Sequence, residues 1–215
     1  MAKVGVSVLS ADFSKVKEWL PQLEKAKPEM IQWDVMDNKY VPNSGVPIEE
    51  IKKLRPKTKL FFDVHLMVQQ PEKYFNQLKG YGADSLTFHV ETSNNPKKTI
   101  KEIRGLGLGA GIAVNNKISA KKISPFLSKV DLALVMTVEA GFGGQNFIEK
   151  NLSKVKLLRE AIDKEGLNCE IQVDGGINAE TGKKSVEAGA DILIAGSYVI
   201  KSGDIPKRVQ TLKNL

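Results

Sequence analysis

Eight short runs rich in apolar and β-branched residues recur along the chain, and amphipathic segments separate them. Such runs are typical of β-strands buried on both faces, whereas the segments between them have the periodicity of helices. The predicted strands are Val4–Leu9, Met30–Met36, Leu60–Met67, Ser85–Val90, Gly109–Val114, Leu132–Thr137, Glu170–Asp174 and Ile192–Ala195. The predicted helices include Ser14–Lys25, Glu72–Lys79, Lys97–Leu106, Lys150–Lys164 and Ala179–Ala188.

Regular alternation of strands and helices predicts an α/β fold with a parallel sheet. Eight strand–helix units in 215 residues leave about 27 residues for each unit. A closed (β/α)₈ barrel with short loops can be built from about 200 residues, and we therefore expect a TIM barrel. An open doubly wound sheet is the alternative. No linker, low-complexity tract or block of like charge divides the chain, so we expect one barrel domain over residues 1–215.

The charge of the chain bears on its partners. Its 32 Lys and Arg against 25 Asp and Glu leave a net charge of +7. The lysines are scattered in pairs such as Lys52-Lys53 and Lys97-Lys98, without the basic stripe interleaved with aromatic residues that marks many nucleic-acid-binding proteins. We therefore expect no nucleic-acid partner, and a basic field that attracts a small anionic substrate.

Cysteine content and hydropathy indicate the cellular compartment of the protein. The single cysteine, Cys169, excludes an internal disulfide and a Cys-rich zinc cluster. Residues 1–13 hold only a short apolar run, and no later segment is long enough for a membrane span. We expect a cytoplasmic protein with no membrane association.

Several predicted strands carry polar residues that alternate with apolar ones. In a parallel barrel, residues two apart share a direction, toward either the axis or the helices. The apolar set faces the helices, so the polar set faces the axis: Gln32, Asp34, Asp63, His65, Thr87, His89, Gln172 and Asp174. Active sites of such barrels lie at the carboxyl ends of the strands, where Asp34, His65 and Asp174 occur.

A buried carboxylate is costly unless it is paired or ligated. Asp34, His65 and Asp174 converge from three predicted strands and would satisfy one another around a divalent metal. For each residue alone, a structural role is an alternative. The convergence of all three at strand ends favours a functional site.

Glycine-rich segments follow the last three predicted strands. Gly141–Gly144 has the sequence GFGG, Gly175 and Gly176 follow Asp174, and Gly196-Ser197 ends the eighth strand. Glycines let the backbone approach a ligand and offer N–H groups to an anion. In TIM barrels, the loops after strands seven and eight commonly bind phosphate. We predict a phosphate site here, with tight turns alone as the alternative.

These segments together resemble a known family. SVLSADF, DVMDNKYVPN, DVHLMV, TFHVE, MTVEAGFGGQNF, VDGGIN and AGADILIAGS resemble the signature segments of ribulose-phosphate 3-epimerases, in the usual order, between residues 7 and 197. The resemblance implies a barrel that interconverts D-ribulose 5-phosphate and D-xylulose 5-phosphate in the pentose phosphate pathway. The alternatives are an epimerase for another phosphorylated ketose, such as allulose 6-phosphate, and a barrel that binds sugar phosphate without catalysis.

The expected chemistry explains the residue types. Inversion at carbon 3 removes a proton from one face and returns one to the other, so two acid/base groups must flank a flat enediolate. Asp34 and Asp174 match the family's catalytic aspartates. The enediolate oxygen calls for fixed positive charge, which a divalent metal supplies as a Lewis acid.

The resemblance also implies the remaining site residues and an assembly. The residues that match substrate contacts are Ser7, His65, Gly141, Phe142, Gly143, Gly144, Gly175, Gly176, Gly196 and Ser197. Met36, Met67 and Met136 match methionines that line the enediolate, and Asp34, His65 and Asp174 match metal ligands. Relatives form dimers or hexamers, so we expect a homo-oligomer.

One metal-ligand position departs from the family. Gln32 stands where the family normally has histidine. A glutamine oxygen can ligate a hard cation but poorly replaces imidazole for zinc or iron(II). Gln32 is then an oxygen ligand, a neighbour of a three-ligand site, or a donor to the enediolate in a metal-free site. We expect altered but retained binding of one divalent ion (Mn, Mg, Fe(II) or Zn), with poor activation by zinc.

Overall fold

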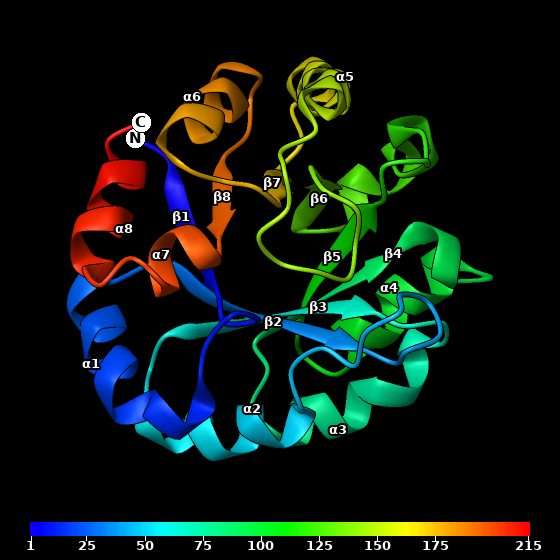
Figure 1. The fold of residues 1–215 in the computed structure, drawn as a ribbon. Coiled ribbons are helices and arrows are strands. Elements are labelled where there is room, and N and C mark those ends of the chain that lie inside the picture. The colour runs from blue at the N-terminus through cyan, green and yellow to red at the C-terminus, as the bar shows by residue number, and fades with distance from the viewer.

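The computed structural model describes residues 1–215 and contains a closed barrel of eight parallel strands that pair in chain order. The first and last strands close the ring, with Val4 opposite Leu193. Helices surround the strands, and the two termini lie side by side (Figure 1). The predicted TIM barrel is confirmed, and the open sheet is wrong because an open sheet would leave its first and last strands unpaired.

The strands are β1 (Lys3–Ser7), β2 (Met30–Met36), β3 (Phe61–Met67), β4 (Ser85–His89), β5 (Gly109–Val114), β6 (Leu132–Met136), β7 (Glu170–Asp174) and β8 (Ile192–Ala195). The predicted bounds of β2, β5, β7 and β8 are confirmed, and those of the other strands are wrong by one or two residues. The largest difference is at β1, which ends at Ser7 because Leu9 already lies in the turn that follows the strand.

The helices are α1 (Val16–Ala26), α2 (Ile48–Leu54), α3 (Phe75–Gly80), α4 (Pro96–Gly105), α5 (Leu152–Glu165), α6 (Ala179–Glu187), α7 (Ser197–Ile200) and α8 (Ile205–Lys213). All five predicted helices are present with shifted ends, and α2, α7 and α8 add to them. The β5–β6 connection holds only the 3₁₀ helices Ala120–Lys122 and Ser124–Lys129. Pro125 would interrupt one α-helix through both segments, because it has no N–H to donate to the preceding turn.

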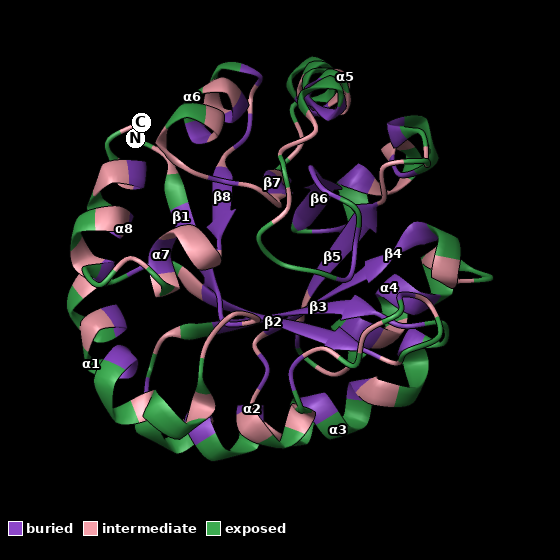
Figure 2. Cartoon of the chain, viewed as in Figure 1, coloured by how far each residue is buried: buried purple, intermediate pink, exposed green.

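The main core lies between the strands and the helices, where fifty buried residues form one cluster. Its largest fully buried side chains include Trp33, Phe62 and Phe88, each on the helix-facing side of its strand. Figure 2 shows the strands buried and the outer helix surfaces exposed. This layer holds the strands in place, so that residues of the opposite parity are directed into the barrel.

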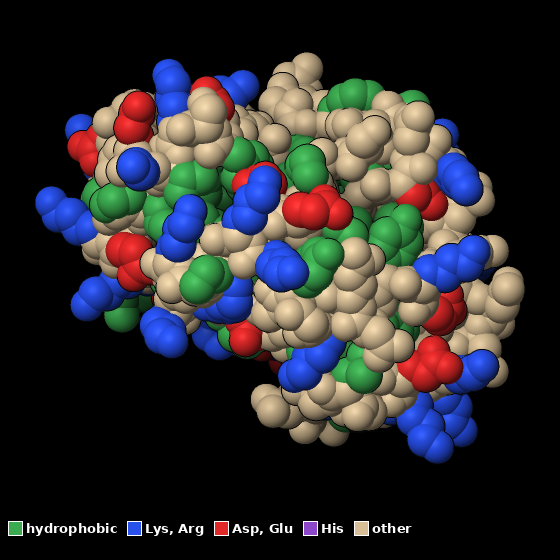
Figure 3. Space-filling view, turned by 90° about the horizontal axis from the view of Figure 1, so that it is seen from below, with side chains coloured by type: hydrophobic (Ala, Val, Ile, Leu, Met, Phe, Trp, Pro, Cys, Tyr) green, Lys and Arg blue, Asp and Glu red, His purple; other side chains and the backbone are tan.

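Two features of the outer surface bear on the expected partners. No helix combines the length and the apolar character that a membrane crossing requires. On the face seen in Figure 3, Lys and Arg side chains are scattered among acidic and uncharged ones and form no continuous stripe.

Candidate active site

A cavity of about 460 Å³ lies at the carboxyl ends of the strands. Its walls come from strand ends and from the loops that follow β6, β7 and β8. The predicted residues that line it are Ser7, Asp34, Met36, Met67, Met136, Gly141, Phe142, Gly143, Gly144, Asp174, Gly175, Gly176, Gly196 and Ser197. Only Gln32 and His65 of the predicted set are not in its lining. The structure therefore gathers residues from both ends of the sequence around one space.

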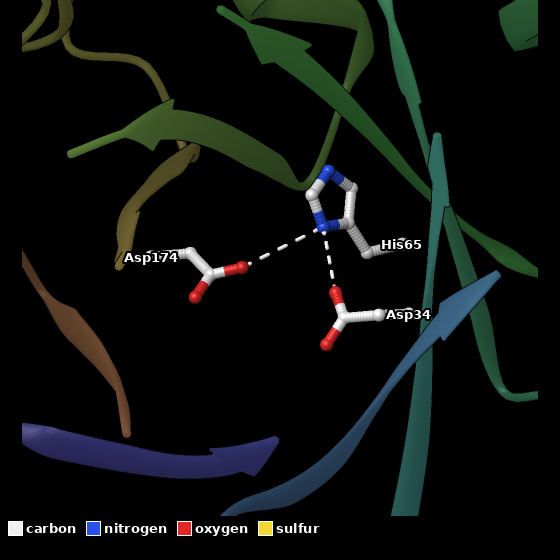
Figure 4. A group of neighbouring side chains, drawn as sticks. All are labelled: Asp34, His65 and Asp174. Atoms are coloured by element: carbon white, nitrogen blue, oxygen red, sulfur yellow. Dashed lines mark hydrogen bonds and ion pairs between the residues drawn. The ribbon is translucent and has the colours of Figure 1, made fainter. Parts of the chain in front are cut away.

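Asp34 and Asp174 form the polar floor of this cavity, and His65 lies against both of them (Figure 4). One ligand atom of each residue lies within 4.8 Å of those of the other two. Parallel pairing of β2 with β3 sets Asp34 beside His65, while Asp174 approaches from β7. The predicted convergence of these three residues is confirmed.

His65 is fully buried beneath the two carboxylates. Its Nδ1 lies 3.0 Å from Asp34 Oδ1 and 3.6 Å from Asp174 Oδ2. Burial alone would lower the pKa of His65, but the two carboxylates outweigh it and raise the pKa to about 9. Because the ring does not line the cavity, direct contact of His65 with a substrate stays a prediction.

The two aspartates have different surroundings. Asp34 is buried and accepts a hydrogen bond of 2.6 Å from Ser7 Oγ. The side chain of Asp174 keeps 15% of its surface exposed, toward the cavity that it lines. Burial and the nearby charge of Asp34 raise the pKa of Asp174, although contacts with His65 and Gln32 oppose this. The direction of this pKa shift favours a proton on Asp174.

Gln32 lies below the aspartates and presents its NH₂ group to both. Gln32 Nε2 donates to Asp174 Oδ2 at 2.7 Å and to Asp34 Oδ1 at 3.2 Å. Its carbonyl oxygen, Oε1, is buried without a hydrogen-bond partner. A metal ligand would have to be that oxygen, because an amide nitrogen carries no free lone pair.

These contacts test whether a divalent cation fits. Two carboxylate oxygens and one imidazole nitrogen converge, and this donor set suits Mn²⁺, Fe²⁺ or Zn²⁺. Gln32 fits only after its amide turns by half a rotation, which would direct the unpartnered Oε1 toward the carboxylates. Asp34, His65 and Asp174 therefore fit a cation without rearrangement, whereas Gln32 would fit it only after this rotation of its amide.

Apolar side chains form the wall beside the polar floor. Met36, Met67 and Met136 are buried and pack together with Leu134 and Val138 in a cluster separate from the main core. The three methionines also line the cavity. An apolar wall of this kind lowers the local dielectric and strengthens the electrostatic interactions of the floor.

The glycine loops form part of the cavity rim, and two positions there require glycine. Gly175 has φ of 117°, and a Cβ atom would lie 2.3 Å from a methyl carbon of Val138. Gly176 has φ of 67°, and its Cβ would lie 2.9 Å from the backbone nitrogen of Phe147. The loop between β6 and α5, yellow-green in Figure 1, also carries Phe142, whose side chain is half exposed.

The cavity has further lining residues that the sequence analysis missed: Leu9, Ser10, Val138, Gln145, Ile177, Asn178, Ile194, Tyr198 and Lys201. Lys201 follows Ser197 by four residues and caps the short helix α7, a spacing that could have indicated it. His89, predicted to face the axis, lies behind His65. Its other neighbours come from loops and could not be inferred from strand parity.

Solved structures share this fold. KGPDC from Streptococcus mutans superposes with a TM-score of 0.72 at 16% identity, covering 100% of this chain and 96% of that one. A 3-hexulose-6-phosphate synthase superposes with a TM-score of 0.71 at 13% identity, covering 99% and 98%. At these identities the likeness concerns the fold alone.

Sequence relatives are much more similar. The ribulose-phosphate 3-epimerase of Bacillus subtilis is 38% identical over 214 residues, which cover 99% of both chains. That of Methanocaldococcus jannaschii is 37% identical over 213 residues, covering 99% of this chain and 90% of the relative. Residues 3–200 match the sequence model of the Ribulose-phosphate 3 epimerase family. The chain therefore belongs to the ribulose-phosphate 3-epimerase family.

Proposed function

We propose that this enzyme interconverts D-ribulose 5-phosphate and D-xylulose 5-phosphate. The observation that carries the proposal is the pair of carboxylates on the cavity floor, with Asp34 from β2 and Asp174 from β7. Membership of the epimerase family supports the same activity. The relatives' names do not favour the alternatives, allulose 6-phosphate epimerisation and binding without catalysis.

The two aspartates act as base and acid. In one direction, Asp34 takes the proton from carbon 3, and the electron pair of the broken C–H bond forms a C2–C3 double bond while the ketone oxygen gains negative charge. Asp174 then gives a proton to the opposite face of carbon 3, and the ketone re-forms. The raised pKa of Asp174 suits it to begin as the acid. In the reverse direction the two roles exchange.

The remaining floor residues stabilise the enediolate. Gln32 Nε2 and the Ser7 hydroxyl hold the carboxylates in place through hydrogen bonds. Asp34, His65 and Asp174 would hold a divalent cation, which supplies Lewis-acid stabilisation of the developing oxyanion. The methionine wall excludes water, so that the proton returned to carbon 3 comes from a carboxyl group.

The glycine rim is the proposed phosphate grip. Gly175, Gly176, Gly196 and Ser197 line one side of the cavity, and Lys201 is nearby. Backbone N–H groups at glycines and a lysine cation suit a phosphate dianion. Binding of the phosphate at this rim would direct the sugar carbons toward the carboxylates.

Three expectations about the whole protein stay predictions. The closure of β1 on β8 supports one domain over residues 1–215. We also propose a cytoplasmic location and a homo-oligomer, a dimer or a hexamer.

Epimerisation in deuterium oxide tests the proposed function. Metal-stripped protein is given D-ribulose 5-phosphate, and deuterium at carbon 3 is followed before and after addition of Mn²⁺, Mg²⁺, Fe²⁺ or Zn²⁺. We expect exchange at carbon 3 together with formation of xylulose 5-phosphate, and a faster rate with manganese than with zinc. Absence of exchange under every condition would refute the proposal.

A further inference from the structure

A second histidine stands behind the candidate catalytic floor. His89, at the end of β4, is fully buried, and its Nε2 lies 2.9 Å from His65 Nε2. The two rings lie 5.1 Å apart between centroids, at an interplanar angle of 25°. At that separation, one of the facing nitrogens must carry a hydrogen and the other a lone pair. The contact therefore ties the hydrogen positions of the two histidines together.

The other ring nitrogen of His89, Nδ1, contacts the Tyr40 hydroxyl, whose hydrogen is donated to a different residue. Tyr40 OH lies 3.0 Å from His89 Nδ1 and donates its hydrogen to Glu91 Oε1 at 2.7 Å. It also accepts a hydrogen bond of 2.9 Å from Asn115 Nδ2. A phenol has one hydrogen to give, so toward His89 the Tyr40 oxygen can only accept. His89 Nδ1 must then be the donor.

The charge states agree with this assignment. One carboxylate adjoins His89, with Glu91 Oε1 3.5 Å from His89 Nδ1, whereas two carboxylates adjoin His65 Nδ1. A positive charge is therefore better stabilised on His65, and the fully buried His89 ring is neutral with a single N–H. Burial would raise the pKa of Glu91, but contacts with His89 and Tyr40 outweigh it and lower the pKa, so Glu91 is an ionised acceptor. A neutral His89 with its hydrogen on Nδ1 has a lone pair on Nε2. The hydrogen between the two rings therefore belongs to His65 Nε2.

The consequence lies at the other nitrogen of His65. With a hydrogen held on Nε2, His65 Nδ1 is left facing Asp34 Oδ1 at 3.0 Å and Asp174 Oδ2 at 3.6 Å. This nitrogen is then the one available to a proton or a cation shared with the carboxylates. A His65 ring of the other tautomer would carry its hydrogen on Nδ1 and could not ligate a cation there.

We propose that His89, Tyr40 and Glu91 are positioning residues that hold His65 in the tautomer with its hydrogen on Nε2 and its Nδ1 directed at Asp34 and Asp174. They act through His65 and need no contact with substrate. The consequence for catalysis rests on the proposed epimerase function. The hydrogen-bond order itself rests only on the contacts of these residues, so the two can be tested separately.

Tyr40→Phe is the most direct test, because it removes only the hydroxyl. The matched control is Tyr81→Phe, which removes a hydroxyl that accepts from Gln77 on the surface. The chain has only two histidines, so the imidazole ¹⁵N resonances can be assigned without ambiguity. Spectra are recorded with and without added Mg²⁺, together with kcat and KM.

In the parent protein we expect His89 to carry its hydrogen on Nδ1 and His65 to keep one on Nε2 in both conditions. In Tyr40→Phe, Glu91 Oε1 remains as an acceptor but lies farther from His89 Nδ1, at 3.5 Å, so the His89 shifts should move partly toward the other tautomer. Its kcat should fall about tenfold or more, with KM changed less than about twofold, as is usual when support of a ligand is lost. Unchanged histidine shifts in Tyr40→Phe, or a kcat loss without a tautomer change, would overturn the proposal.

His89 offers an independent comparison. In His89→Gln, the amide oxygen can still accept from His65 Nε2 and the NH₂ can still donate to Tyr40, whereas His89→Leu can do neither. We expect the Gln variant to retain clearly more kcat than the Leu variant, and equal losses would count against the proposal. If the parent protein shows no epimerase activity, the histidine spectra still decide the hydrogen-bond order, while the proposed function alone fails.

Discussion

Two clusters of polar side chains, each containing at least one buried carboxylate, lie inside this barrel. The pocket cluster consists of Asp34, Asp174, His65 and Gln32, directly under the cavity. The sealed cluster consists of Asp63, Ser85, Thr87 and Gln172, one layer closer to the amino ends of the strands. The two clusters are neighbours in the β2–β3 pairing: Gln32 lies opposite Asp63, and two residues further on Asp34 lies opposite His65.

The two clusters satisfy their carboxylates differently. Asp63 is fully buried and accepts hydrogen bonds from Ser85 Oγ at 2.6 Å, Thr87 Oγ1 at 3.4 Å and Gln172 Nε2 at 3.3 Å. All these donors are neutral, and Asp63 does not line the cavity at the carboxyl ends of the strands. The pocket cluster instead pairs two carboxylates with an imidazole and opens onto a cavity. An inward-facing aspartate is therefore a candidate catalyst only where space for a substrate adjoins it.

The largest expected effect is at the pocket cluster. Asp174→Asn cannot exchange a proton with carbon 3, so we expect kcat to fall by about 10³-fold or more. Its melting temperature should change little, because the amide can keep the contact with Gln32 after rotation. Steady-state kinetics and thermal unfolding measure the two quantities. A kcat within tenfold of the parent value would show that Asp174 is not a proton donor.

The next effect concerns the metal. Gln32→His adds an imidazole beside three candidate ligands, so we expect its zinc affinity to rise roughly tenfold or more. Gln32→Leu is the control, because it removes the same hydrogen bonds without adding a ligand. Zinc affinity is measured by chelator competition on metal-stripped protein. An equal gain in both variants would mean that the amide merely blocks the site, and full parent activity with one bound zinc would refute poor activation by zinc.

The smallest expected effect is at the sealed cluster. Asp63→Asn should leave kcat within about twofold, because Asp63 is remote from the cavity. We expect the free energy of unfolding to rise by about 1 kcal/mol at neutral pH, since a buried charge is removed and the amide can donate to the unpartnered Gln172 Oε1. Urea unfolding measures this, and a loss of stability at neutral pH would contradict it.

The direction of the Asp63 pKa shift determines how the stability of Asp63→Asn depends on pH. Burial raises the pKa of Asp63 above its unfolded value, although hydrogen bonds from Ser85 and Gln172 oppose this. As pH rises, the unfolded chain therefore loses the Asp63 proton near pH 4, whereas the folded chain keeps it to a higher pH. The contribution of Asp63 to stability is present below about pH 4 and is lost as pH rises through the folded pKa. The advantage of Asp63→Asn should thus be absent near pH 4 and grow toward neutral pH.

Strand parity alone does not distinguish the two clusters. Parity indicated correctly that Asp34, Asp63 and Asp174 face the barrel axis, and the buried positions of these residues agree. It could not separate the sealed carboxylate from the other two, since depth along the axis depends on how the strands are staggered. Strand parity also could not show that His65, expected to contact the substrate, lies below the cavity.

The strand order, the inward direction of the polar residues and the glycine positions of the rim follow from the sequence alone. Period-two alternation and turn chemistry are local properties, and each residue carries them wherever the strand is placed. Only the tertiary structure decided that Gln32 directs its NH₂ group at both carboxylates and that Tyr40 and Glu91 meet behind His89. Those contacts join segments far apart in the chain, and their geometry exists only once the barrel has closed.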